Sequence, residues 1–336
     1  MNLATSVVSS VAKEAAAKAF GCSIDDLTVT PVNGGYSRNR RSIVAYSGKW
    51  LFAKEVDKDV LDGDGAEELR WLKKDYQLTD ILRTEVPELV SDWAQLYADD
   101  HVLLMSSYRQ EDGWLWSLPA DPNMQGDYIH AVIDATRRLE SVTLNTAPTD
   151  HLALEPYFRD KLAYDEGLSQ LLSDETLRTR LIEKYTALIV TESRPWLVDA
   201  YAAVRDVLRD PKQLQVIASI ATGLIKQPDD RFNHCDVRSD NIAYHPGSGK
   251  IKFVDWNWAS YAPARFGSTE FLIDMARHGV DVSKWKHELN RELLAATVGF
   301  YARRCLEPPL APGSTLRDMQ AESAAIAVQL LSMLDT

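Results

Sequence analysis

Three polar side chains have the types and the spacing that phosphoryl transfer requires. Asp236 ends the segment His234-Cys235-Asp236, Asn241 follows five residues later, and Asp255 comes at the end of the next strand pattern. Transfer of a phosphoryl group needs a carboxylate that receives the proton of the attacking hydroxyl, and it needs oxygen ligands for Mg²⁺. Asp236 suits the first task, and the other two residues could together hold one hard cation.

A β-hairpin is the element that must bring Asn241 and Asp255 together. The letters IAYH directly after Asn241 are followed by the turn Pro246-Gly247-Ser248-Gly249 and by the alternating sequence KIKFVDW. This pattern predicts two antiparallel strands joined by a tight turn. The two metal-binding candidates should therefore lie at the same end of the hairpin.

The composition permits a large core and disfavours several classes of partner. The chain has 336 residues, 45% of them hydrophobic, which is enough for about two domains. Thirty-seven basic against 49 acidic residues give a net charge of -12. Because this charge repels polyanions, we expect neither nucleic acid nor an anionic membrane surface as a partner.

Cysteine usage and the N-terminal sequence predict a cytoplasmic protein. The three cysteines, Cys22, Cys235 and Cys305, lack CxxC spacing, so neither a disulfide framework nor a zinc site is indicated. Lys13 interrupts the alanine-rich start, which is typical of a helix closed by Gly21 rather than of a signal sequence. No apolar run reaches the roughly 18 to 20 residues needed to cross a bilayer.

The order of predicted elements indicates an α+β protein with two lobes. The segments LTVTPV, RSIVAYS and WLFAKEV predict an antiparallel meander, a helix is expected at about 66–76, and HVLLMSSY predicts a further strand. The following sequence is mostly helical, with long amphipathic stretches at about 284–304 and 315–334. We predict a small antiparallel-sheet lobe at residues 1–107 and a larger, mostly helical lobe at residues 108–336.

The segments HCDVRSDN and VDW resemble the HxDxxxxN loop and the following hairpin aspartate of aminoglycoside and choline kinase-type phosphotransferases, which are relatives of the protein kinases. The resemblance implies a protein-kinase-like fold and ATP-dependent transfer of a phosphoryl group to a hydroxyl of a small molecule. It gives Asp236 the position of the catalytic base, gives Asn241 and Asp255 the Mg²⁺ positions, and gives His234 a structural role. Cys235 stands where many members have glycine, a variation that we expect to be tolerated.

Lys54 is the residue that the resemblance assigns to the nucleotide phosphates. It lies in the apolar strand pattern LFAKEV, where alternate side chains point to one face. Its partner should be an acid on the following helix. The spacing to Leu72 favours Glu68, with Glu67 as the alternative.

Two further segments are assigned to the nucleotide by the same resemblance. The loop from Asn33 to Asn39, including Gly34, Gly35 and Ser37, would cover the phosphates with backbone N–H groups. It lacks the full GxGxxG spacing. The segment from Met105 to Tyr108 would be the hinge that meets the adenine, with Ser106 and Tyr108 as its binding residues.

Several alternatives stay open at the level of sequence. Arg238 either contacts phosphate or substrate, or pairs with Asp240 or another neighbour. About 90 residues separate the predicted helix at 128–142 from His234, and neither DFG nor APE follows Asp255, so a protein substrate is disfavoured. The acceptor class, the choice of ATP or GTP, the oligomeric state and a role in antibiotic resistance are not determined. The rivals are a catalytically inactive nucleotide-binding module, a pseudokinase, and a helical scaffold in which HCDVRSDN is accidental.

Overall fold

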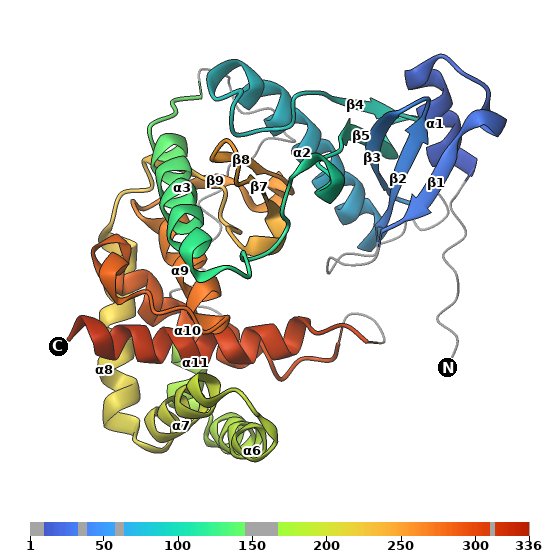
Figure 1. Cartoon of the computed structure of the whole chain (residues 1–336). Helices are drawn as coiled ribbons and strands as arrows, with labels where there is room; N and C mark the ends of the chain where they lie inside the picture. Colours follow the sequence, from blue (N-terminus) through green and yellow to red (C-terminus); the bar gives the residue numbers. More distant parts are fainter. Residues whose placement is uncertain (1–9, 33–38, 58–63, 145–166, 310–312, 336) are drawn as a thin grey trace. The chain divides into compact units, whose positions relative to one another are not determined.

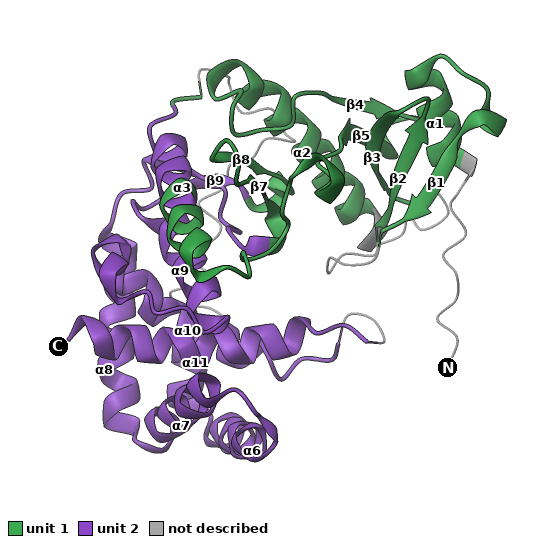
Figure 2. Cartoon of the chain, in the orientation of Figure 1, with its two compact units in different colours: residues 1–131, 143–153, 240–258 green, residues 132–142, 154–239, 259–336 purple. Residues whose placement is uncertain are grey.

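The computed structural model describes residues 10–32, 39–57, 64–144, 167–309 and 313–335. The chain divides into two compact units, each assembled from separate stretches of sequence (Figure 2). Unit 1 comprises residues 1–131, 143–153 and 240–258, and unit 2 comprises residues 132–142, 154–239 and 259–336. The predicted lobe boundary between residues 107 and 108 stays a prediction.

A five-stranded antiparallel sheet forms the centre of unit 1 (Figure 1). Its order is β1-β2-β3-β5-β4, and its strands are β1 Thr28–Pro31, β2 Arg40–Tyr46, β3 Lys49–Glu55, β4 Ala94–Tyr97 and β5 Val102–Ser106. Strands β2 and β3 are joined by Ser47 and Gly48, whose φ angles are 46° and 76°. Positive φ at both central residues is the geometry that matches the twist of a tight hairpin. The predicted meander is therefore confirmed.

The two faces of this sheet are covered by different helices. Helix α1 (Ser10–Phe20) packs its alanines against a cluster that contains Val44, Ala53 and Leu104. Helix α2 (Asp64–Glu85) belongs to a second cluster, in which its buried Leu72 packs with Leu103 and Met105. Since successive side chains of a strand point to opposite faces, the side of β3 that carries Lys54 is the α2 side.

The predicted hairpin near residue 245 also belongs to unit 1. Strands β7 (Ile242–His245) and β8 (Lys250–Phe253) pair antiparallel, with Ile242 opposite Phe253. The Val254 backbone N–H donates to the Asn241 carbonyl at 3.0 Å. Asn241 and Asp255 thus flank the same end of this hairpin, as the sequence predicts.

The described part of unit 2 is mostly helical and contains one short strand pair, β6 (Arg231–Asn233) and β9 (Ser260–Ala262). Its helices are α5 Leu168–Ser173, α6 Glu175–Thr191, α7 Pro195–Arg209, α8 Pro211–Ala221, α9 Phe266–Arg277, α10 Arg291–Arg304 and α11 Leu316–Leu334. Helix α3 (Pro122–Glu140) contributes to both units. None of the helices in the described ranges is both long and apolar enough to cross a membrane.

One predicted helix is shorter than the sequence pattern suggests. The amphipathic stretch at about 284–304 is divided into a 3-10 segment, Ser283–Glu288, and helix α10. Asn290 separates them, because its extended backbone starts a new helix and its side chain accepts a hydrogen bond from the Leu293 N–H at 3.0 Å. An asparagine in this role satisfies an N–H group that would otherwise lack a partner.

The packing of α2 on the sheet predicts a large penalty for truncating Leu72, which is 0% exposed. We expect Leu72→Ala to lower the free energy of unfolding by about 2–5 kcal/mol, because it removes buried methyl groups and leaves a cavity. Ile24→Ala is the control in the same unit, since Ile24 is 42% exposed. Chemical denaturation followed by circular dichroism measures the free energy of unfolding of both variants. Equal decreases in the two variants would contradict this packing.

Candidate active site

Lys54 lies between two carboxylates of unit 1. Its Nζ is 3.2 Å from Asp75 Oδ2 and 2.7 Å from Asp255 Oδ1. The Lys54 and Asp75 side chains are almost completely buried, whereas the Asp255 side chain is 30% exposed. The second oxygen of Asp75 accepts a hydrogen bond from the Trp256 N–H at 3.2 Å, and Trp256 itself is buried. Strand β3, helix α2 and the end of the hairpin therefore meet at one ammonium group.

The acid that pairs with Lys54 on α2 corrects the sequence prediction. Glu68 was the predicted partner and Glu67 the alternative, but the structure places Asp75 in this role, while Glu67 pairs with Arg70 at 3.6 Å. Helix α2 is 22 residues long and extends well beyond the predicted end at residue 76. Since Glu68 and Asp75 are seven residues apart, they lie on the same helix face. The periodicity identified the correct face but not the correct turn.

The two carboxylates favour the charged form of Lys54. Burial lowers the pKa of Lys54, but the carboxylates of Asp255 and Asp75 outweigh it, so that the pKa lies above its ordinary value. Burial raises the pKa of Asp75 above its ordinary value, although the ammonium of Lys54 opposes this rise. The positive charge of Lys54 is directed to the end of the hairpin where a metal and phosphates would need it.

Asp255 and Asn241 have the donor chemistry of a Mg²⁺ site. A carboxylate and an amide oxygen are hard ligands, and Mg²⁺ takes few of them from protein when phosphates supply the others. Asp255 has a φ of 67°, and its Oδ1 also accepts a hydrogen bond from the Asn257 side chain. Within the described ranges, no group of three or more His, Cys, Asp or Glu side chains is placed to hold a metal. Asp255 and Asn241 would supply two of the oxygen ligands of a Mg²⁺ ion whose other ligands come from phosphates.

The loop that carries Asp236 belongs to unit 2 and is held by helix α9. The Val237 N–H donates to Glu270 Oε2 at 3.4 Å, and the Ser239 N–H donates to Asp274 Oδ2 at 2.9 Å. Asp274 is 3% exposed and also pairs with Arg277 at 2.6 Å. Glu270 and Asp274 are four residues apart on α9, a spacing that places both side chains on one side of the helix.

Arg238 pairs with the carboxylate of Asp236. The sequence left open a contact with phosphate or substrate and a pairing with Asp240 or another neighbour. The structure identifies that neighbour as Asp236, and both side chains are 16% exposed.

Cys235 adopts a left-handed backbone conformation, with a φ of 58°, and it is 1% exposed. This geometry explains why glycine suits the position, because any residue with a Cβ is strained there. The adjacent His234 is completely buried. The loop thus tolerates cysteine at a cost in backbone energy.

This strain predicts an unusual order of stability for small residues at position 235. We expect Cys235→Gly to be more stable than Cys235→Ala by up to about 1 kcal/mol, because glycine relieves the left-handed strain. Cys305 is the matched control, since it is also buried in unit 2 but has a φ of -65° at the end of α10. At that position the alanine variant should be the more stable by about 0.5–1 kcal/mol. Thermal denaturation that gave the same order at both positions would contradict the strain.

Glu270 is a half-buried acid near Asp236. Burial, followed by the negative charge of Asp236, raises the pKa of Glu270 well above its ordinary value. A group whose pKa is raised in the folded state stabilises the protein fully below the pKa of the unfolded state. This contribution to the free energy of unfolding is lost as the pH rises through the folded-state pKa. Ionised Glu270 therefore destabilises unit 2 at higher pH.

We expect the Glu270→Gln variant to melt at a higher temperature than the wild type, with a difference that grows between pH 5 and pH 9. Glutamine keeps an oxygen for the Val237 N–H but carries no charge. Asp281→Asn is the control, because hydrogen bonds from Ser283 lower the pKa of Asp281, so its effect should be constant over that range. A difference for Glu270→Gln that did not depend on pH would refute the assignment.

The predicted hinge residues Ser106 and Tyr108 lie at and just after the end of β5. Ser106 exchanges hydrogen bonds with Trp93: its N–H donates to the Trp93 carbonyl at 2.9 Å, and its Oγ accepts from the Trp93 N–H at 3.1 Å. The Tyr108 carbonyl accepts a hydrogen bond from the Trp116 indole at 2.6 Å. Their contact with a nucleotide stays a prediction. The predicted phosphate loop with Gly34, Gly35 and Ser37 lies outside the described residues.

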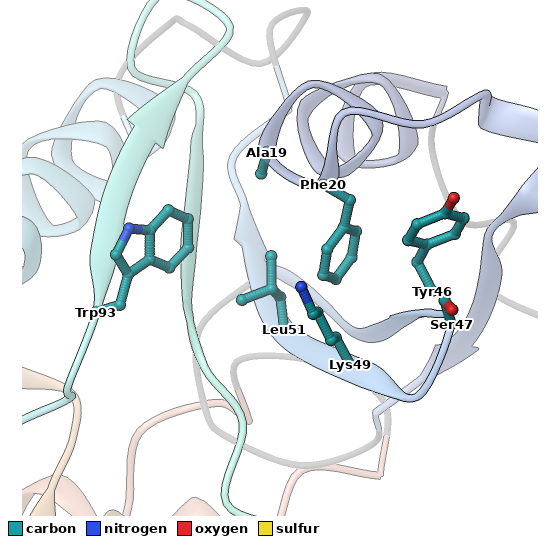
Figure 3. A pocket seen from close by; sticks show the side chains of 7 residues that line it. All are labelled: Ala19, Phe20, Tyr46, Ser47, Lys49, Leu51 and Trp93. Atoms are coloured by element: carbon teal, nitrogen blue, oxygen red, sulfur yellow. The ribbon is translucent and has the colours of Figure 1, made fainter.

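A cavity of about 330 Å³ lies in unit 1 (Figure 3). It is lined by Ala19, Phe20, Tyr46, Ser47, Lys49, Leu51 and Trp93. Because Leu51 and Lys54 differ by an odd number of residues along β3, they point to opposite faces of the sheet. The cavity therefore lies on the α1 face of the sheet, whereas Lys54 points to the opposite, α2 face.

No protein-family model matches this sequence, and no curated protein matches it significantly. Solved structures do resemble it. The choline kinase LicA from Streptococcus pneumoniae has a TM-score of 0.54 at 14% identity, over 95% of this chain and 97% of that one. The structure of LicA in complex with AMP has a TM-score of 0.51 at 14% identity, over 97% of this chain and 99% of that one.

A thermostable mutant of aminoglycoside phosphotransferase APH(4)-Ia gives a TM-score of 0.50 at 12% identity, over 95% of this chain and 97% of that one. Identities this low establish the fold only. The predicted resemblance is thereby confirmed at the level of architecture. The chain has the two-lobed, protein-kinase-like α+β fold of the choline kinase and aminoglycoside phosphotransferase structures.

Proposed function

We propose that this protein is an ATP-dependent kinase that transfers the γ-phosphoryl group to a hydroxyl of a small molecule. The observation that carries the proposal is the 2.7 Å contact between Lys54 and Asp255. These residues are 201 positions apart, and each was assigned to the nucleotide phosphates or their metal from a separate motif. An accidental motif would give no reason for the two side chains to meet.

The residues of unit 1 would hold the nucleotide. Lys54, fixed by Asp75, would neutralise charge on the phosphates, and Asn241 with Asp255 would hold Mg²⁺. The metal, when bound, would stabilise the negative charge that develops on the phosphoryl oxygens. Ser106 and Tyr108 would contact the base. Preorganised charges of this kind account for most of the catalysis of phosphoryl transfer.

Asp236 of unit 2 would receive the proton of the acceptor hydroxyl. Five residues of chain join it to Asn241, so the two cannot be more than about 17 Å apart even when fully extended. The guanidinium of Arg238, which contacts this carboxylate, would help to hold it in place. The hydrogen bonds from the loop backbone to α9 would fix the direction of this carboxylate.

The acceptor is proposed as a class only, a small hydroxyl-bearing molecule such as an amino alcohol, a sugar or an aminoglycoside. The fold is shared by structures described as a choline kinase and an aminoglycoside phosphotransferase, and their acceptors are hydroxyl compounds of this size. We expect no nucleic acid, membrane or protein as the acceptor.

Release of ADP from Mg·ATP in the presence of amino alcohols, sugars, aminoglycosides and macrolides tests the function. We expect one class to stimulate release, and we expect Asp236→Asn to lower kcat by about 10²- to 10⁴-fold, because it removes the proton acceptor. The affinity for Mg·ATP should change by less than about threefold, since Asp236 acts on the acceptor. The Asp240→Asn variant is the control, because Asp240 is exposed in the same loop.

Full activity of Asp236→Asn would exclude Asp236 as the base. Mg·ATP binding without turnover of any acceptor would instead favour the pseudokinase. Absence of any stabilisation by Mg·ATP would leave only the scaffold hypothesis.

A further inference from the structure

A buried lysine that the phosphotransfer chemistry does not use connects the hairpin to the predicted hinge. Lys252 lies on β8, three residues before Asp255, and is 5% exposed. Its Nζ donates to the carbonyls of Pro87 and Val90 at 3.0 and 2.7 Å, and to Asp92 Oδ1 at 2.8 Å. An ammonium has three N–H donors, so this side chain is fully used. It fixes the chain that precedes β4 to the hairpin.

Asp92 passes this constraint to Tyr108. The Asp92 N–H donates to the Tyr108 hydroxyl at 3.0 Å, and that hydroxyl donates to Asp92 Oδ2 at 3.3 Å. Burial raises the pKa of Tyr108 above its ordinary value, so the hydroxyl keeps its proton and can donate throughout the physiological range. The Asp92 carboxylate thus accepts a hydrogen bond from Lys252 on one oxygen and a hydrogen bond from Tyr108 on the other.

Neighbouring contacts hold the same segment at further points. Ser91 Oγ accepts from the Ser106 N–H at 3.2 Å and donates to the Trp93 carbonyl at 2.8 Å. The ring of Trp114 lies 4.7 Å from that of Tyr108, centroid to centroid, and the Trp116 indole is bonded to the Tyr108 carbonyl. Both ends of Tyr108, its hydroxyl and its carbonyl, therefore have a fixed direction.

A fixed hinge matters for the choice between purine bases. Adenine offers an amino donor beside a ring nitrogen acceptor, whereas guanine offers a carbonyl acceptor beside a ring N–H donor. Backbone groups held at one angle match one of these patterns and leave buried polar groups unpaired against the other, which is penalised. A segment free to shift could adapt to both.

We propose that Lys252, Asp92 and Tyr108 form a positioning network that determines which purine nucleotide the protein accepts. This inference rests on the proposed nucleotide-binding function. None of the three side chains would need to touch the base, because they act by holding the backbone of residues 106–108. The network is thus separate from Lys54 and Asp255, which would serve the phosphates of either nucleotide.

The ratio of the dissociation constants for Mg·GTP and Mg·ATP, measured by calorimetry, tests the network. We expect the dissociation constants of the wild type to differ by at least about tenfold between the two nucleotides. One base would form hydrogen bonds with the hinge, whereas the other would leave the hinge groups unpaired. Tyr108→Phe should move the ratio towards one by about three- to tenfold, as expected for the loss of the hydrogen bonds between the Tyr108 hydroxyl and Asp92. Lys252→Met should shift the ratio in the same direction.

Tyr185→Phe is the matched control. Tyr185 is also buried, and its hydroxyl donates one hydrogen bond, to the Ala321 carbonyl at 3.3 Å, in unit 2. Its loss should leave the ratio unchanged, whatever it does to stability. A change in both affinities by the same factor in Tyr108→Phe would indicate a structural role alone and overturn the proposal.

The remaining outcomes are also decisive. A wild type that binds both nucleotides equally well would show that the hinge does not select a base, and this would overturn the network while leaving the kinase function intact. A wild type that binds neither nucleotide would instead contradict the proposed function itself. Tyr108→Phe keeps the aromatic ring, so it decides the question even if Lys252→Met does not fold.

Discussion

The buried ammonium of Lys54 is the constraint on which the rest of the candidate site depends. A charge removed from water is costly unless it is paired and hydrogen-bonded. Its partners, Asp75 and Asp255, come from helix α2 and from the end of the β7-β8 hairpin. The position of the sheet, the helix and the hairpin within unit 1 is therefore tied to one charge. Loss of one partner would leave an uncompensated charge, which typically costs about 3–5 kcal/mol.

Other ionisable side chains also connect separate chain segments near the candidate site. Lys252 is a second buried ammonium with every donor used, and it fixes the hairpin to the segment that precedes β4. In unit 2, Glu270 and Asp274 accept hydrogen bonds from the loop that carries Asp236. In each case an ionisable side chain outside the proposed chemistry holds a backbone segment that carries residues of the proposed site.

The sequence predicted those features that depend on local pattern. The hairpin that aligns Asn241 with Asp255 follows from alternation and a turn, and both are local. The partner of Lys54 was assigned to the wrong turn, because the periodicity of a helix specifies a face but not the height at which another chain segment meets it. The left-handed backbone of Cys235 was hidden for a similar reason: glycine would have signalled it, whereas cysteine does not.

If Asp255 and Lys54 bind a metal-bound nucleotide, as we propose, ATP binding must depend on Mg²⁺. Calorimetric titration of ATP with and without Mg²⁺ would be made on the wild type and on Asp255→Asn. We expect Mg²⁺ to tighten ATP binding by at least about tenfold in the wild type, and we expect this gain to be lost in the variant because a charged oxygen ligand is gone. An equal gain in both proteins, or ATP binding that is indifferent to Mg²⁺ in the wild type, would contradict the account.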